Sequence, residues 1–427
     1  MLKHAGRWPL FIVNFVRAFL KRMKMSEKRT DETTNGQNEL LQRCGGLERQ
    51  TNIIEIMGQE TKALGFAGNT KLPQLVYLTL LTGMLDRPVS LLIKGPSGAG
   101  KSFSLKTGKY FIPKAAYEEF EGMSEKAIVY LQNLSLINRH LIIGEASGMA
   151  DGAGRTLLRQ LLSEGKVRYA TVESTDSGLK GSELPTLKGP CGLIMTTTAV
   201  GIHPEDENRM LSVNMKESPD QIGAALIAQA EGIIKPVSEP NTGPWFALYE
   251  YMQTLPKTVK IPFAREIAVR MPQTHDKVKR DFPQILSLIR ASALLHSCTR
   301  DKDEDGDVIA TLDDYRIVYD SANEAVSQGL AKSVPESIRT LVEAVGRKPY
   351  EGLSVTLLAE KLGRDISVIS RTAKKAVDEG YLIDTNPGQG RISKLTVGDR
   401  KLPSGSAMPS PEEISRVEIK ALAMRSA

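Results

Sequence analysis

Residues 89–102 have the sequence VSLLIKGPSGAGKS, in which a short apolar run leads into a glycine-rich loop. The loop fits the phosphate-binding pattern G-x-x-x-x-G-K-[ST]. Its glycines allow successive backbone N–H groups to turn toward phosphate oxygens, and the helix expected to begin near Lys101 points its positive end at the same anion. Lys101 adds a charge for the β and γ phosphates, and the Ser102 hydroxyl is a ligand for Mg²⁺. A glycine-rich turn without a ligand is disfavoured because the strand and helix context is present. The loop therefore predicts a site for a nucleoside triphosphate, made of Gly95, Pro96, Ser97, Gly98, Ala99, Gly100, Lys101 and Ser102.

The composition is that of an ordinary globular chain. Of its 427 residues, 41% are hydrophobic and 25% are charged, which fits two to three domains with a sizeable core. The net charge of +6 is compatible with a polyanionic partner. The scattered Cys44, Cys191 and Cys298 have no metal-ligand spacing and favour a reducing, cytoplasmic compartment. The apolar residues 9–20 are too few to span a membrane, so we expect no membrane partner.

Strands and helices alternate after the phosphate-binding loop, which predicts an α/β fold with a parallel sheet and a ligand at the carboxyl ends of the strands. A helix over 72–85 precedes the loop, and a second strand is expected near 109–112, followed by a helix over 124–136. Apolar runs at 141–143 and 192–198 predict two more strands, and 155–163 predicts a helix between them. From 218 to about 332 the pattern is mainly helical.

Triphosphate hydrolysis also needs a group that orients water and cations that neutralise the transferred phosphoryl group. Glu145 follows the strand at 141–143 and is the candidate for the first task and for a share of Mg²⁺; the alternative is a helix-start carboxylate. Thr197 and Thr198 end the next strand and can hydrogen-bond water or phosphate, although threonine is also an ordinary strand residue. Arg209, in a polar loop, can reach the phosphate of a neighbouring subunit or simply be solvated.

The order of these motifs resembles the core of AAA+ ATPases. The stretch from Leu161 to Thr198 is similar to the hairpin and polar-ended strand of minichromosome-maintenance-type helicases and of replicative helicases carried by phages and mobile elements. Residues 279–290, KRDFPQILSLIR, resemble the lid helix that bears their sensor-2 arginine, which makes Arg280 the candidate. The resemblance covers about residues 75–300 and implies a hexameric ring, with Arg209 acting in trans on a neighbour's ATP.

The resemblance has three departures. Gly144 occupies the position where the family usually has an acidic Mg²⁺ partner, the polar residue of the next strand is threonine rather than asparagine, and the segment between the loop and Glu145 lacks a long insert. The metal would then depend on Ser102, Glu145, phosphates and water, so we expect secure ATP binding and weaker hydrolysis.

Two segments are candidates for contact with DNA. The resemblance implies that a hairpin after residue 166 points into a central pore, where Arg168 and Lys180 can meet the backbone of the nucleic acid. A solvated loop lysine is an equally good reading of Lys180. Residues 335–397 have the pattern of a winged helix, with helices over 335–345, 355–362 and 365–378 and a hairpin turn at 387–390. Its exposed cations, suited to phosphate contact, are Arg371, Lys374, Lys375 and Arg391.

Residues 301–308, DKDEDGDV, match the start of an EF-hand loop, but its twelfth position is Leu312 instead of glutamate. A turn between two short strands explains the same residues.

Together these patterns predict a P-loop AAA+ core, a helical lid and a C-terminal winged-helix domain. The expected divisions are a disordered basic extension at 1–50, the ATPase core at 51–216, the lid at 217–332, the winged helix at 335–397 and a flexible tail at 398–427. The expected function is an ATP- and Mg²⁺-dependent DNA helicase or translocase in replication of a phage or mobile element, working on single-stranded or forked DNA with a separate primase or loader. The alternatives are a DNA-binding AAA+ regulator or loader that does not unwind, and a nucleotide switch with negligible turnover.

Overall fold

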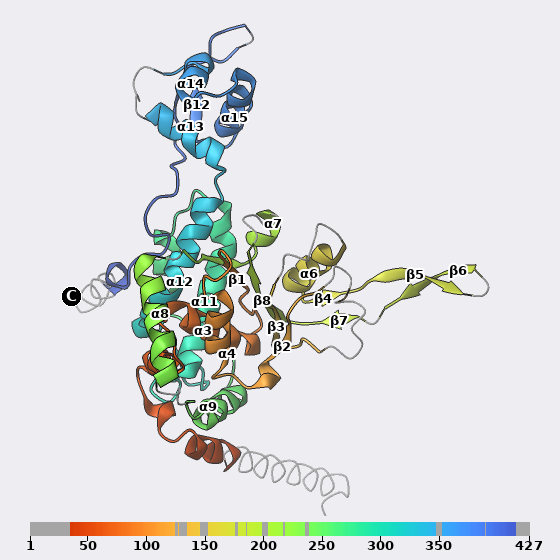
Figure 1. Ribbon diagram of the computed structural model, residues 1–427, viewed down its shortest axis with the longest axis vertical. Coiled ribbons are helices and arrows are strands. Elements are labelled where there is room, and N and C mark those ends of the chain that lie inside the picture. Colours follow the sequence, from red (N-terminus) through yellow and green to blue (C-terminus); the bar gives the residue numbers. More distant parts are fainter. Residues whose placement is uncertain are drawn as a thin grey trace, which may run out of the picture.

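The computed structural model of the chain describes residues 35–123, 127, 135–145, 153–175, 178–184, 186–198, 204–216, 218–234, 239–346, 352–388 and 390–415. The fold is α/β (Figure 1). Its centre is a five-stranded sheet in which every neighbouring pair is parallel. The strands lie in the order β2 (Tyr117–Phe120), β3 (Arg139–Ile143), β8 (Cys191–Thr197), β1 (Leu91–Lys94) and β9 (Leu211–Asn214).

The strands are apolar because both faces of the sheet are covered. Successive side chains alternate between the faces, so Leu91 and Ile93 enter one hydrophobic core while Leu92 enters another. The first core is shared with α3 (Lys71–Leu81), α11 (Asp276–Leu295) and α12 (Leu312–Lys332), and the second with α6 (Ala153–Glu164). The predicted parallel sheet with flanking helices is thus confirmed.

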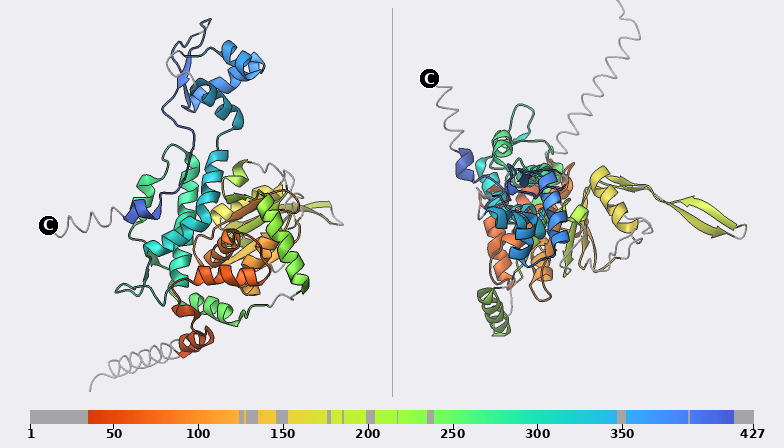
Figure 2. Two further views of the ribbon diagram at one scale, coloured as in Figure 1. Left: turned by 60° about the vertical axis from the view of Figure 1, so that its left-hand side comes forward. Right: turned by 90° about the horizontal axis from the view of Figure 1, so that it is seen from above.

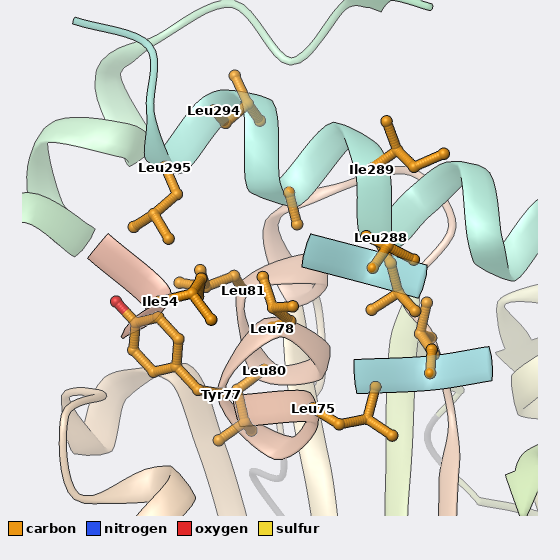
Figure 3. Packing of buried hydrophobic residues seen from close by; sticks show 14 of the residues in the cluster. Ile54, Leu75, Tyr77, Leu78, Leu80, Leu81, Leu288, Ile289, Leu294 and Leu295 are labelled. Carbon is orange, nitrogen blue, oxygen red and sulfur yellow. The ribbon is translucent and has the colours of Figure 1, made fainter. Parts of the chain in front are cut away.

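The helices of the first core interlock through leucines. Figure 3 shows Leu288 and Leu295 of α11 lying over Leu78 and Leu81 of α3, with Ile54 of α2 (Ile53–Ala63) beside them. All five side chains are 4% exposed or less. Burying such a side chain contributes roughly 1.5–3 kcal/mol, so this contact holds the helical region on the sheet.

The second strand was expected at 109–112, and that prediction is wrong. Helix α4 (Lys101–Lys109) occupies the start of this range, and the strand is β2, eight residues later. The apolar side chains that suggested a strand are buried in a turn instead, where the ring of Phe111 lies 4.9 Å from that of Trp245. Most of the helix predicted over 124–136 lies outside the described residues.

The predicted disordered extension at 1–50 is wrong for the part that the structure describes. Residues 35–43 are helical, a 3₁₀ turn follows at Leu47–Arg49, and Cys44 is buried. Gln37 Nε2 donates to Thr254 Oγ1 at 3.0 Å, and Arg43 pairs with Glu250 at 3.2 Å. Both partners belong to α9 (Gly243–Thr254), so this segment packs on the body.

The region from 218 to 332 is mainly helical, as predicted. It contains α8 (Pro219–Ile234), α9, α10 (Ala264–Arg270), α11 and α12, with the short strands β10 (Val259–Lys260) and β11 (Val308–Ile309). Helix α12 runs along β9 and α3 and begins with a capping box between Thr311 and Asp314. Within the described residues no helix is both long and apolar enough to cross a membrane.

The acidic turn at 301–308 is closed by hydrogen bonds and an ion pair to Asp303. The carboxylate of Asp303 accepts from the backbone N–H groups of Asp305 and Asp307 and pairs with Lys260. Gly306 has φ +81°, as the turn requires. Within the described part of the chain no group of three or more His, Cys, Asp or Glu is arranged to hold a metal ion. The turn explanation therefore holds over the EF-hand one.

Residues 336–397 form a unit with a hydrophobic core of its own (Figure 1). It contains α13 (Glu336–Gly346), α14 (Val355–Leu362), α15 (Ile366–Asp378), and the antiparallel strands β12 (Leu382–Asp384) and β13 (Leu395–Val397). We call it the C-terminal unit. Helix α14 ends at Gly363, with φ +62°, and Asp365 caps α15 by accepting from Ser367 N at 2.8 Å.

The predicted flexible tail at 398–427 is wrong for its described part. After the C-terminal unit the chain returns to α12, where Ala407, Met408 and Ile414 are buried (Figure 2). Tyr315 donates its hydroxyl to Pro409 O at 2.6 Å, which fixes the returning segment. Apolar residues separated by prolines and serines gave no periodic signal, so the sequence concealed this contact.

A two-stranded arm projects from the far side of the body (Figures 1 and 2). It consists of β5 (Ala170–Thr175) and β6 (Gly178–Glu183), and its base is the pair β4 (Lys166–Val167) and β7 (Leu187–Lys188). The strands of the arm pack chiefly against each other, and Val172 is 63% exposed. The predicted hairpin is thus present.

Candidate nucleotide site

The phosphate-binding loop lies at the carboxyl end of β1, between the ends of β8 and β9. Gly95 N donates to Thr197 O at 3.3 Å, which continues the ladder with β8. Gly98 and Gly100 have φ +89° and +78°, a conformation that L side chains rarely adopt. A Cβ on Gly95 would lie 3.0 Å from Met215 O, so glycine is also needed here for close approach of the chain after β9.

Lys101 is the first residue of α4 and only 7% exposed. Its Nζ donates to the carbonyl oxygens of Gly95 at 2.9 Å and Pro96 at 2.8 Å, which holds the ammonium inside the loop. The hydroxyl-bearing Ser102 is exposed at the start of the same helix. A buried cation, a helix N-terminus and a curled glycine backbone together favour a polyphosphate.

Glu145 follows β3, two strands away from β1. Its backbone N–H donates to Glu121 O at 2.8 Å, and its carboxyl-bearing side chain is half-buried. A Cβ on the preceding Gly144 would lie 3.3 Å from the same carbonyl oxygen, so glycine lets the chain after β3 approach the chain after β2. This contact is the physical reason why an acidic residue does not fit easily at Gly144.

The threonines of β8 stand between the loop and Glu145 because β8 lies between β1 and β3. Thr196 donates its hydroxyl hydrogen to Gly144 O, so it joins two strand ends. Thr197 is buried and is the register partner of Lys94, next to the loop. Thr198 is exposed at the same edge. The candidates Lys101, Glu145, Thr197 and Thr198 therefore share one edge of the sheet.

Four polar residues around the loop were not identified from the sequence. Lys94, only 4% exposed, ends β1 and pairs with Glu207 of α7 (Pro204–Glu207). Asn214 ends β9 and accepts from Lys332 at the end of α12. These residues belong to separate elements and carry no motif; only their position at strand and helix ends could have suggested them.

Arg209 lies in the turn after α7 and is half-buried against α6. Its guanidinium donates to Ser163 Oγ of the same chain, while its buried Nε has no hydrogen-bond partner in the structure. The neighbouring Arg159 of α6 pairs with Glu205 at 2.6 Å and with Asp206. Two arginines thus fasten α7 and its turn to α6. A role in trans would require Arg209 to leave Ser163.

Arg280 is exposed in the second turn of α11. Among its described neighbours are Asp276, whose carboxyl pKa is lowered by Lys279 and, to a smaller degree, by Arg280, and Asp281, whose carboxyl pKa is raised by burial against the opposing effect of Lys277 and Arg280. No described hydrogen bond or ion pair joins its side chain to β1, β9 or the phosphate-binding loop. One turn later, Gln284 of α11 accepts from Ser90 N just before β1, so this helix lies beside β1, and the role of Arg280 stays a prediction.

The two candidate nucleic-acid surfaces differ in how their cations are held. In the arm, Lys180 is exposed, while Arg168 at its base pairs with Glu183 at 2.7 Å. In the C-terminal unit the cations are exposed on α15 and in the turn before β13, and comprise Arg371, Lys374, Lys375 and Arg391. Lys375 has a loose ion pair, 3.9 Å from Glu379.

His140 is a buried residue of β3 that contacts the chain just before β1. It is fully buried in β3, its Nε2 lies 3.0 Å from Val89 O, and burial lowers its pKa to about 4. A Cβ on Gly192 would collide with the same ring at 2.2 Å from Nε2. The imidazole therefore fills the space that this glycine leaves, and it does so in its neutral form.

Comparison with known proteins adds no relative. The sequence matches no protein-family model, and no curated protein matches it.

Proposed function

We propose that this chain is an AAA+ ATPase that uses ATP and Mg²⁺ to move along or unwind DNA in the replication of a phage or mobile element. The observation that carries the proposal is the convergence at one sheet edge of a phosphate-binding loop, the carboxylate of Glu145 and the hydroxyls of Thr197 and Thr198. A polyphosphate cradle beside a carboxylate and hydroxyl donors suits hydrolysis of a nucleoside triphosphate, and the order of the motifs and the cations of the C-terminal unit favour a DNA motor over other such enzymes.

The loop fits a nucleotide with its metal. The backbone of residues 95–101 and Lys101 Nζ would hold the phosphates, while Ser102 Oγ and Glu145 would hold Mg²⁺. Bound Mg²⁺ supplies charge neutralisation to the transferred phosphoryl group. Glu145 accepts a proton from the attacking water and fixes its position, and the threonine hydroxyls donate to water or phosphate. Because Gly144 adds no second carboxylate, turnover is expected to be slow.

Contact with single-stranded or forked DNA is supported mainly by α15 of the C-terminal unit. Three cations, Arg371, Lys374 and Lys375, stand exposed on this helix, whose own carboxylate is Asp378 and whose flanking caps are Asp365 and Glu379. Cations on one helix of a small helical unit suit the phosphate backbone. A winged helix is the fold that we propose for the unit, and a hexameric ring with Arg209 at the subunit boundary is the proposed assembly.

The decisive experiment measures ATP hydrolysis with and without single-stranded DNA, with the mass of the particle determined in the presence of ATP. We expect stimulation by DNA and a ring-sized particle. Glu145→Gln should bind ATP normally and lose about 10²–10⁴-fold in turnover, as for a lost general base. A monomer that ignores every nucleic acid would refute the proposal, and an unchanged Glu145→Gln variant would favour a nucleotide switch.

A second candidate is a DNA-binding AAA+ regulator or helicase loader that does not unwind. It is favoured by the arm, whose residues 170–183 carry Lys180 as their single cation and are therefore poorly suited to grip a DNA strand. Strand displacement separates the two functions. ATP-dependent unwinding of a forked duplex supports the helicase, and DNA-stimulated hydrolysis without unwinding supports the regulator or loader.

A further inference from the structure

The last residue of α12, Lys332, contacts the sheet beside the phosphate-binding loop. Its Nζ donates to Asn214 Oδ1, and Asn214 is the register partner of Lys94, the residue before Gly95. One turn earlier, Gln328 Oε1 accepts from Asn214 N and from Asn214 Nδ2, both at 2.9 Å. Two residues of α12 thus hold the carboxyl end of β9 at the loop.

Among the described residues around Lys332, lysines outnumber carboxylates. The Lys332 side chain is largely exposed; partial burial is the main cause that lowers its pKa, Lys94 and Lys216 lower it further, and Glu207 offsets part of this effect. Glu207 is already paired with the buried Lys94. Within the described residues, three ammonium groups therefore lie near the one carboxylate of Glu207 at this sheet edge, and such an arrangement favours an anion.

We propose that Lys332 is a positioning residue through which the helical region responds to a nucleotide in the loop. This inference rests on the proposed ATP site. A triphosphate next to Lys94 and Lys216 neutralises the surplus charge and strengthens the hold of Lys332 on the end of β9.

The same residue is joined to the C-terminal unit by a very short connection. Helix α12 ends at Lys332 and α13 begins at Glu336. Arg339 of α13 donates to Ala331 O at 2.8 Å, so the first turns of α13 are fastened to the end of α12. A shift of Lys332 relative to β9 therefore moves α13 and, with it, the cations of α15.

The test uses hydrogen–deuterium exchange of residues 333–340 in the full chain, with and without Mg·ATP, together with ATP affinity measured by fluorescence. The main variant is Lys332→Met, which keeps the aliphatic stem. We expect about 5–50-fold weaker ATP binding, within the range of typical couplings, and loss of the ATP-dependent protection in this segment. Lys332→Arg should restore both.

A further variant serves as the control. Lys62, exposed in the last turn of α2, has no ion pair within the described part of the chain, and Lys62→Met should stay within about twofold of the wild type. Failure of the wild type to bind ATP would refute the proposed function itself. If the wild type binds ATP and Lys332→Met retains both affinity and protection, the inference on Lys332 is overturned.

Discussion

The two parts that extend from the body, the arm of β5 and β6 and the C-terminal unit, are built on opposite principles (Figure 1). The C-terminal unit buries its own core, and its cations are exposed around that core. The arm buries little, and residues 170–183 contain Glu173, Asp176 and Glu183 against Lys180. Both were candidates for DNA contact, yet only the C-terminal unit has the charge that a phosphate backbone requires.

The difference between the two parts should be largest in their response to truncation of a side chain. Leu358 is fully buried in the C-terminal unit, so Leu358→Ala should destabilise it by about 2–5 kcal/mol. Val172→Ala in the arm should change stability by less than about 0.5 kcal/mol, because that side chain is mostly exposed. Urea unfolding followed by hydrogen exchange checks both, and equal losses would show that the arm is not the loosely packed part.

Acid should destabilise the body more than it destabilises the arm or the C-terminal unit. Residues 170–183 and 336–397 contain no histidine, whereas the body contains the buried His140. Its pKa is lowered from 6.5 to about 4, so its stabilising effect is complete above pH 6.5 and is lost as the pH falls toward 4. The free energy of unfolding falls by about 3 kcal/mol over this pH range. His140→Gln, which can still donate to Val89 O, should flatten this dependence in unfolding experiments; a profile identical to the wild type would contradict the assignment.

DNA affinity should follow the cations of α15. The triple variant Arg371→Ala, Lys374→Ala, Lys375→Ala should weaken binding to single-stranded DNA about 10–100-fold at low salt and reduce the salt dependence by about two charges. Fluorescence anisotropy at several salt concentrations measures both quantities. The exposed Lys361 of α14 offers a matched single control, Lys361→Ala. A triple variant with unchanged affinity and slope would remove the C-terminal unit from the DNA interface.

The smallest effect is expected in the arm. Lys180→Ala should change DNA affinity by less than about threefold, because one exposed lysine contributes little among carboxylates. Its more informative readout is hydrolysis: if the arm enters a pore, the variant loses DNA stimulation and keeps basal turnover. Loss of neither would assign the arm to another task.

The same contrast explains which features could be predicted from the sequence. Signals carried by neighbouring residues were reliable: the cap at Asp365, the stop at Gly363 and the loop before Lys101 all lie where they were expected. Contacts between distant segments were not: Cys44 and Met408 are buried by helices far away in the chain. In the candidate site, the positions of Glu145 and Thr197 at one edge follow from strand alternation, whereas Lys94, Glu207 and Lys332 meet only through the tertiary fold.

The most direct test of the central claim is a titration with Mg·ATP that compares the wild type with Lys101→Ala. Lys106→Ala is the matched control, because Lys106 is exposed on the same helix and no described hydrogen bond or ion pair joins its side chain to the loop. We predict micromolar binding by the wild type and by Lys106→Ala, and at least about 100-fold weaker binding by Lys101→Ala, as expected for loss of a buried charge-assisted contact. Equal affinities for all three proteins, or no binding by the wild type, would contradict the account.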